Sequence, residues 1–157
     1  MASTNPHKLQ EFREILEPLG VAVVDLASLS ESFDEPVEDA PTFAGNARLK
    51  ALGYAANTGR VCVADDSGLS VDALDGRPGV MSARFAGSIG TRDERDAANN
   101  AMLLALMDGV PDDKRSARFE CAVCVADPNG TIIAESHGTF EGVISREPAG
   151  ENGFGYD

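Results

Sequence analysis

The sequence of 157 residues has little of what most zinc, redox and membrane proteins require. It contains three cysteines, two histidines and no tryptophan. Three sparsely placed cysteines do not make a disulfide framework. Cys121 and Cys124 lie on an alternating apolar run, where residues three apart point to opposite faces of a strand, so they do not form a metal pair. No apolar run approaches the roughly 20 residues of a membrane span, and no signal-peptide pattern opens the chain. We therefore expect a cytosolic protein.

Positive charge is also scarce. Thirteen Lys and Arg residues stand against 26 Asp and Glu residues, which leaves a formal net charge of −13. Such a surface repels phosphate backbones and anionic lipids, so we expect neither a nucleic-acid polymer nor a membrane as partner. A small phosphorylated ligand is compatible with this charge, because one divalent cation inverts the local potential. Serine-nucleophile, Walker and HExxH motifs are missing, so any catalysis depends on carboxylates.

Apolar periodicity and capping residues predict helices that alternate with strands, which is an α/β fold. Pro6 begins the first expected helix, with Asn5 as its cap. A hairpin is expected where Pro128-Asn129-Gly130 separates two apolar runs. The expected helices cover residues 6–19, 43–58 and 92–107, and the expected strands cover residues 21–24, 61–64, 117–126, 131–134 and 139–144.

Asp65 and Asp66 are the first candidates for chemistry. They follow the apolar run 61–64, so the pattern places them at the carboxyl end of a buried strand, where open α/β sheets bind ligands. Adjacent residues diverge there, so one aspartate is expected to face a site and the other to face the structure. Carboxylates of this kind hold Mg²⁺ together with substrate phosphates, and Glu38 in an acidic loop is a second contributor. Asp-Asp-Ser-Gly is also typical of an ordinary polar turn, and that interpretation stays open.

Two further segments are candidates for ligand binding. The start of the first helix, from Ser3 to Lys8, offers free N–H groups and a positive dipole end, and a phosphate explains Lys8 there better than helix stability does. The segment from Gly153 to Asp157 combines glycines, which let a ligand approach, with the rings of Phe154 and Tyr156, which a base can stack on. A solvated lysine and a tight turn are the alternatives. A metal site, an anion site and a stacking surface together make up a nucleoside-triphosphate site.

Five segments stand in the order of a known family: residues 3–8, Thr42-Phe43 with Asn46-Ala47, residues 64–69, Pro78-Gly79-Val80 with Ser82-Ala83-Arg84-Phe85, and residues 153–157. On these segments the chain closely resembles the inosine/xanthosine triphosphate pyrophosphatases, the enzymes that remove noncanonical purine nucleotides. The resemblance implies hydrolysis of ITP, dITP and XTP to the monophosphate and pyrophosphate, with Mg²⁺, by a homodimer. It also implies an elongated mixed β-sheet flanked by helices, with two lobes and an active-site cleft between them.

The resemblance also implies a role for each matching residue. Asp66 resembles the general base, which also binds metal, and Glu38 resembles a further metal ligand. Lys8 resembles a catalytic residue that contacts the phosphates. Substrate contacts are implied for Ser3, Thr4, Asn5, Pro6, His7, Lys8, Ser67, Phe154, Gly155, Tyr156 and Asp157.

The sequence departs from the family's pattern in two respects. Gly45 stands where relatives commonly carry glutamate. Relatives also have an apolar first strand and, after Gly-Tyr-Asp, a segment with a lysine and a Ser-His-Arg motif. We therefore expect one pyrophosphatase domain over residues 1–157 that is incomplete at both ends and has reduced turnover.

Two other functions stay open at this point. One is a metal-dependent phosphomonoesterase with an aspartyl nucleophile, although Asp65-Asp66 lacks the expected DxD spacing. The other is a noncatalytic module that binds nucleotide or Ca²⁺, although the acidic loop lacks the spacing of a calcium loop.

Overall fold

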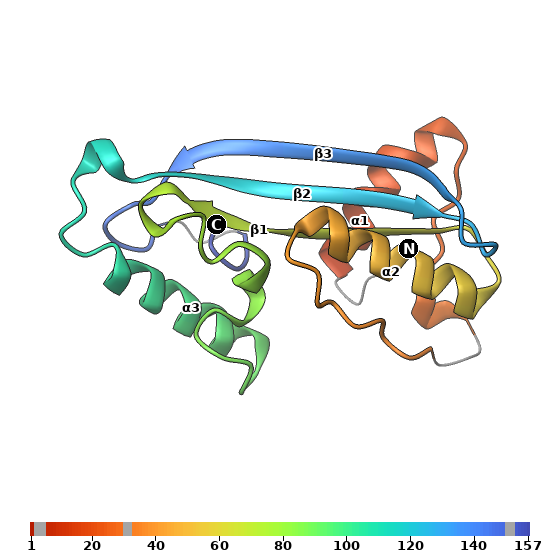
Figure 1. The fold of residues 1–157 in the computed structure, drawn as a ribbon, viewed down its shortest axis with the longest axis horizontal. Helices are drawn as coiled ribbons and strands as arrows, with labels where there is room; N and C mark the ends of the chain where they lie inside the picture. The colour runs from red at the N-terminus through yellow and green to blue at the C-terminus, as the bar shows by residue number, and fades with distance from the viewer. Residues whose placement is uncertain (2–5, 30–32, 150–152) are drawn as a thin grey trace. The chain divides into compact units, whose positions relative to one another are not determined.

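The computed structural model describes residues 1, 6–29, 33–149 and 153–157. Its helices are α1 (Pro6–Leu16), α2 (Phe43–Thr58) and α3 (Arg92–Leu106), and its strands are β1 (Cys62–Val71), β2 (Ser116–Ala126) and β3 (Ile132–Val143) (Figure 1). The predicted α/β class is confirmed. Within the described ranges, none of the helices has both the length and the apolar character needed to cross a membrane.

The three strands form one sheet in the order β1-β2-β3, and neighbouring strands run in opposite directions in Figure 1. The predicted hairpin joins β2 to β3, where Gly130 has a φ of 86° and two backbone amides donate hydrogen bonds to Asp127 Oδ1. The separate strands predicted for residues 131–134 and 139–144 are wrong, because β3 runs through the polar residues between them. Since β3 is exposed along its whole length, burial imposes no alternation that would have revealed one continuous strand.

The chain divides into two compact units, which confirms the predicted division into two lobes. Unit 1 comprises residues 1–66 and 122–137, and unit 2 comprises residues 67–121 and 138–157. The division falls inside each of the three strands, so every strand contributes residues to both units. The predicted cleft between the lobes stays a prediction.

In unit 1, α1 and α2 lie on opposite faces of β1. Lys8 of α1 contacts Asp65, whereas Asn46 of α2 contacts Asp66. Adjacent residues of a strand point to opposite faces, so the two helices cover β1 from two sides.

Helix α2 begins and ends where its capping residues predict. The Thr42 hydroxyl accepts a 3.1 Å hydrogen bond from the Gly45 amide, and Gly59 ends the helix with a φ of 64°. Small residues make up half of the buried face, which consists of Phe43, Asn46, Ala47, Ala51, Tyr54 and Ala55. This small face lets the helix approach β1 closely enough for polar side chains of the helix to reach the strand.

Unit 2 encloses an apolar cluster. Its buried members are Leu69, Val71, Leu74, Leu103, Met107 and Ala117. Helix α3 contributes Leu103 and starts at the predicted capping box of Thr91 and Glu94. Tyr156 packs against the cluster, so the turn at residues 153–157 is attached to the core of this unit.

The predicted position of the two aspartates at the tip of a strand is wrong. Strand β1 continues through Asp65 and Asp66 to Val71 instead of ending near residue 64. The strand resumes its apolar burial at Leu69 and Val71, and neighbouring helices bond the polar side chains in its middle. Partners on other elements thus allow a buried Asp65 and a half-buried Asp66 to stand side by side inside a strand.

The region after α1 also differs from the prediction. The helix ends at Leu16, and a 3₁₀ turn continues to Gly20, whose φ is 79°. The strand predicted at residues 21–24 is wrong, since these residues belong to none of the three strands in the described chain. The Val24 carbonyl accepts a 2.7 Å hydrogen bond from the Met1 ammonium group rather than from a neighbouring strand.

Candidate active site

The Asp66 carboxylate is held by two residues of α2. Asn46 Nδ2 donates a 3.0 Å hydrogen bond to Asp66 Oδ2, and Lys50 Nζ lies 3.5 Å from Asp66 Oδ1. The two helix residues are four apart, so one face of α2 presents both to the strand. Asn46 is itself fixed, because its Oδ1 accepts a 3.0 Å hydrogen bond from the Ala40 amide. Both oxygens of the carboxylate therefore have defined partners.

Lys50 also connects Asp66 to Glu38. Its Nζ lies 3.1 Å from Glu38 Oε2, and only 12% of the lysine side chain is exposed. The two predicted metal ligands thus flank one position that a cation occupies, here the ammonium group of Lys50. The sequence interpretation missed Lys50, although a lysine four residues after Asn46 on a largely apolar helix was an available signal.

Burial raises the pKa of the Asp66 carboxyl above its ordinary value. Glu38 adds to the increase, whereas Lys50, the hydrogen bond from Asn46 and the more distant Lys8 lower the pKa in part. A carboxylate with a raised pKa is a stronger base than an exposed one. It is therefore better suited than an exposed aspartate to accept a proton from water.

The side chain of Asp65 holds helix α1 against strand β1. Its side chain is 3% exposed, and its Oδ2 lies 2.5 Å from Lys8 Nζ, so the pair joins α1 to β1. This agrees with the expectation that the two aspartates diverge. Lys8, the predicted phosphate contact, is thus bonded to Asp65 rather than to Asp66 in this structure. The predicted contacts Ser3, Thr4 and Asn5 lie outside the described residues, as do the side chains of Pro6 and His7.

In unit 2, the predicted purine-binding segment is a turn closed by its own bonds. The Asp157 amide donates to the Phe154 carbonyl at 3.2 Å, and the Phe154 amide donates to Asp157 Oδ2 at 3.2 Å. Gly153 and Gly155 have φ values of 95° and 62°, in the region that favours glycine. The turn therefore requires both glycines.

Ser82 connects this turn to the strand that carries Ser67. The Tyr156 hydroxyl donates a 3.0 Å hydrogen bond to the Ser82 carbonyl, and burial raises the pKa of Tyr156, which keeps the hydroxyl protonated. The Ser82 hydroxyl accepts a 2.9 Å hydrogen bond from the Leu69 amide and donates one of 2.7 Å to the Gly79 carbonyl. Ser67 is half-buried in β1, two residues before Leu69. Unit 2 thus joins two of the predicted substrate-binding segments through a residue that the sequence interpretation had not assigned to the site.

The donor set of Glu38 and Asp66 fits Mg²⁺. Among the described residues, no three Cys, His, Asp or Glu side chains converge as they do in an all-protein metal cage. Mg²⁺ rarely uses such a cage, because it binds through one or two carboxylates and completes its shell with water and substrate phosphates. All three cysteines carry free thiols.

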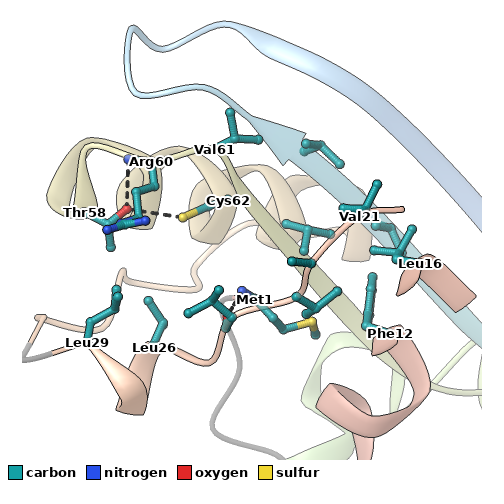
Figure 2. Close-up of a pocket in the computed structure, with 16 residues that line it drawn as sticks. Met1, Phe12, Leu16, Val21, Leu26, Leu29, Thr58, Arg60, Val61 and Cys62 are labelled. Atoms are coloured by element: carbon teal, nitrogen blue, oxygen red, sulfur yellow. Dashed lines mark hydrogen bonds between the residues drawn. The ribbon is translucent and has the colours of Figure 1, made fainter. Parts of the chain in front are cut away.

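Unit 1 also contains an apolar cavity of about 640 Å³ (Figure 2). Phe12, Leu16, Val21 and Val61 are among the side chains that line it, together with Met1 (Figure 2). Glu38, Lys50 and Asp66 are not part of its lining. The walls suit hydrocarbon rather than a triphosphate, so this cavity is not a candidate for the nucleotide.

Comparison with known proteins agrees with the resemblance. The Ham1 family model matches residues 1–157. A relative from Desulforamulus reducens named dITP/XTP pyrophosphatase is 52% identical over 157 residues, which is 100% of this chain and 75% of the relative. A HAM1 protein from Coxiella burnetii has a solved structure that superposes with a TM-score of 0.87 at 39% identity, covering 99% of this chain and 77% of that one.

The structure of a nucleoside-triphosphatase from Mycobacterium abscessus, also titled dITP/XTP pyrophosphatase, superposes with a TM-score of 0.80 at 45% identity. It covers 99% of this chain and 78% of its own. These matches include the elements that carry Glu38, Lys50 and Asp66. The chain therefore belongs to the Ham1 family.

Proposed function

We propose that this chain hydrolyses noncanonical purine nucleoside triphosphates, such as dITP, XTP and ITP, to the nucleoside monophosphate and pyrophosphate. The main support is the Asp66 carboxylate, whose side chain is only 14% exposed, which has a raised pKa and which shares Lys50 with Glu38. The relatives named dITP/XTP pyrophosphatase indicate the substrate class.

Asp66 is the general base in this proposal. It accepts a proton from the attacking water, whose oxygen forms a bond to phosphorus while the bridging bond between the α- and β-phosphates breaks. The products are pyrophosphate and the monophosphate. Asn46 orients the carboxylate through its 3.0 Å hydrogen bond, so the basic oxygen keeps one direction relative to the water.

Glu38 and Asp66 are the proposed ligands of Mg²⁺. The ion, when bound, withdraws negative charge from the phosphates. Lys50 adds positive charge beside these ligands, since its ammonium group contacts both carboxylates. Lys8 adds positive charge from α1. Phosphoryl chemistry depends mainly on positioning and charge stabilisation, so these side chains suffice without a serine or histidine nucleophile.

The purine is assigned to the turn at residues 153–157. The Phe154 side chain is 38% exposed, which leaves ring surface for a base to stack on. Gly155, Tyr156 and Asp157 complete this contact. Ser67 and residues 3–8 are the remaining proposed substrate contacts, the latter on the phosphates.

The proposal includes a homodimer and a cytosolic location, both on the family resemblance. Sedimentation of the purified chain tests the dimer, which should appear at twice the mass of 16.4 kDa. A cytosolic location follows from the nucleotide pool on which such an enzyme acts.

Product analysis tests the function. The chain is incubated with Mg²⁺ and dITP, XTP, ITP, ATP or GTP, and pyrophosphate and orthophosphate are measured separately. We expect pyrophosphate, in equal amount to the monophosphate, from the noncanonical substrates dITP, XTP and ITP, and much less from the canonical nucleotides ATP and GTP.

The other outcomes distinguish the two alternatives. Orthophosphate without pyrophosphate, together with a phosphorylated protein, would identify a phosphomonoesterase. Nucleotide binding without any product would identify a noncatalytic module. Glu38→Gln is expected to raise the Mg²⁺ concentration needed for half-maximal rate, and Glu35→Gln in the same loop is the matched control because Glu35 is exposed.

A further inference from the structure

Two side chains of helix α3 form hydrogen bonds with the backbone of Gly155, one with its amide and one with its carbonyl. Asp96 Oδ2 accepts a 3.2 Å hydrogen bond from the Gly155 amide, and Asn100 Nδ2 donates a 2.8 Å hydrogen bond to the Gly155 carbonyl. Residues 96 and 100 are four apart, so both side chains leave the same face of the helix. A glycine has no side chain to anchor, and the helix therefore holds this part of the turn through its main chain.

Arg92 lies one turn earlier on the same face of α3. Its guanidinium carbon is 4.9 Å from the centroid of the Phe154 ring, a cation–π distance. Its Nε is 3.8 Å from Asp96 Oδ2. The residues at 92, 96 and 100 thus form a row along α3, and the row contacts Phe154 and Gly155 at successive positions.

We infer that Arg92, Asp96 and Asn100 are positioning residues. They fix the conformation in which the turn at residues 153–157 contacts the purine. The inference rests on the proposed function, because that function assigns the purine to this turn. Arg92 packs against the Phe154 ring and so helps to fix the direction in which the ring faces. The three residues act through the turn and have no role in proton transfer, since the Asp66 carboxylate is bonded to residues of α2 instead.

The turn needs these external bonds because it has little internal support. Two hydrogen bonds between Phe154 and Asp157 close it, and Gly153 and Gly155 give its backbone more freedom than other residues would. A loop that samples several conformations binds more weakly, because only the competent fraction accepts the ligand. Bonds from a regular helix raise that fraction before the nucleotide arrives.

Four single variants of the full chain test the inference. Asp96→Ala removes the acceptor for the Gly155 amide, and Asn100→Ala removes the donor to its carbonyl. Asp96→Asn keeps an acceptor oxygen and removes the charge that attracts Arg92. Asp93→Ala is the matched control, because Asp93 is an exposed aspartate in the first turn of the same helix.

Two measurements are made on each variant. The first is the KM and kcat for dITP with Mg²⁺. The second is the equilibrium Kd for dITP in EDTA, by calorimetry, which requires no turnover. Loss of one hydrogen bond to the turn should raise KM and Kd about fivefold in Asp96→Ala and Asn100→Ala, with kcat changed less than about twofold. For Asp96→Asn and Asp93→Ala, both KM and Kd should remain within about twofold of the values for the unchanged chain.

The outcomes separate this inference from the proposed function. If Asp96→Ala and Asn100→Ala have the same KM and the same Kd for dITP as the control Asp93→Ala, the inference is overturned while the proposed function stands. A fall in kcat at constant KM would also overturn it. If dITP is bound but not hydrolysed, the function fails and the Kd series alone decides the inference. A chain that neither binds nor hydrolyses dITP would refute both. If Asp96→Asn binds dITP as weakly as Asp96→Ala does, the lost charge rather than the lost hydrogen bond weakens the binding, and the inferred role of that bond is overturned.

Discussion

The side-chain amide of Asn46 donates a 3.0 Å hydrogen bond to Oδ2 of Asp66, from a helix to the middle of a strand. The bond orients a carboxylate that burial has made more basic. Asn46 is itself 1% exposed and held by the Ala40 amide, so it cannot rotate freely. A half-buried and oriented base next to a lysine is a combination that protein stability alone does not require.

Asp66→Asn should lower kcat for dITP about a hundredfold to ten-thousandfold, the usual contribution of a general base. Folding should survive, because the raised pKa of Asp66 means that the folded state disfavours the charged form. Removing this charge at neutral pH should leave the thermal midpoint unchanged or higher. Asp34→Asn, at an exposed position, is the control and should retain full activity. Full activity in Asp66→Asn would assign the base to another residue.

Lys50→Met should move the pH dependence of kcat/KM. The rate rises with pH as Asp66 loses its proton, and Lys50 lowers the pKa of that carboxyl. Without Lys50 the pKa of Asp66 increases, so the rise in rate should occur at higher pH. Rates for dITP at saturating Mg²⁺ from acid to neutral pH measure the shift. Lys114→Met, at an exposed site, should leave the profile in place, and an unmoved profile in Lys50→Met would refute the coupling.

Alanine at the two glycines of the terminal turn should have unequal effects. A Cβ at Gly153 would lie 2.7 Å from Asp157 Cβ, whereas a Cβ at Gly155 has no neighbour within 4 Å. Both positions have positive φ, so alanine at either one introduces backbone strain of about 1–2 kcal/mol. Gly155→Ala has this strain alone, whereas Gly153→Ala also has a steric clash. The KM for dITP should therefore increase more in Gly153→Ala. Equal KM values in the two variants would contradict the described turn.

Arg115→Met should destabilise the protein. The Arg115 side chain is buried and donates hydrogen bonds of 2.7, 2.7 and 2.8 Å to the carbonyls of Met107, Ile144 and Ser145. The substitution leaves these carbonyls without their donor, and the free energy of unfolding should fall by about 3 kcal/mol. Urea denaturation measures the change. Arg146→Met, at an exposed arginine, should have no measurable effect, and equal stability of both variants would disprove the role of Arg115.

Both limits of α2 and the start of α3 could be predicted because their signals are local, whereas α1 ends at Leu16, before the predicted residue 19. Thr42, Gly59 and the Thr91–Glu94 pair act within a few residues of the backbone groups that they cap, and all three confirm the predicted ends. The strands were less predictable. β3 has no buried face, and β1 contains Asp65 and Asp66, whose burial depends on partners elsewhere in the chain.

Patterns of neighbouring residues thus decided the fold class, the limits of α2, the start of α3, the β2–β3 hairpin and the choice of Asp66 as a candidate site residue. Folding in three dimensions decided which charged and polar groups meet. The Asn46–Asp66 bond spans 20 residues, and the bonds from Asp96 and Asn100 to Gly155 span 59 and 55. No local preference of the chain encodes such pairs. They form because small buried residues bring α2 close to β1, and because packing on one apolar cluster brings the turn at residues 153–157 to α3.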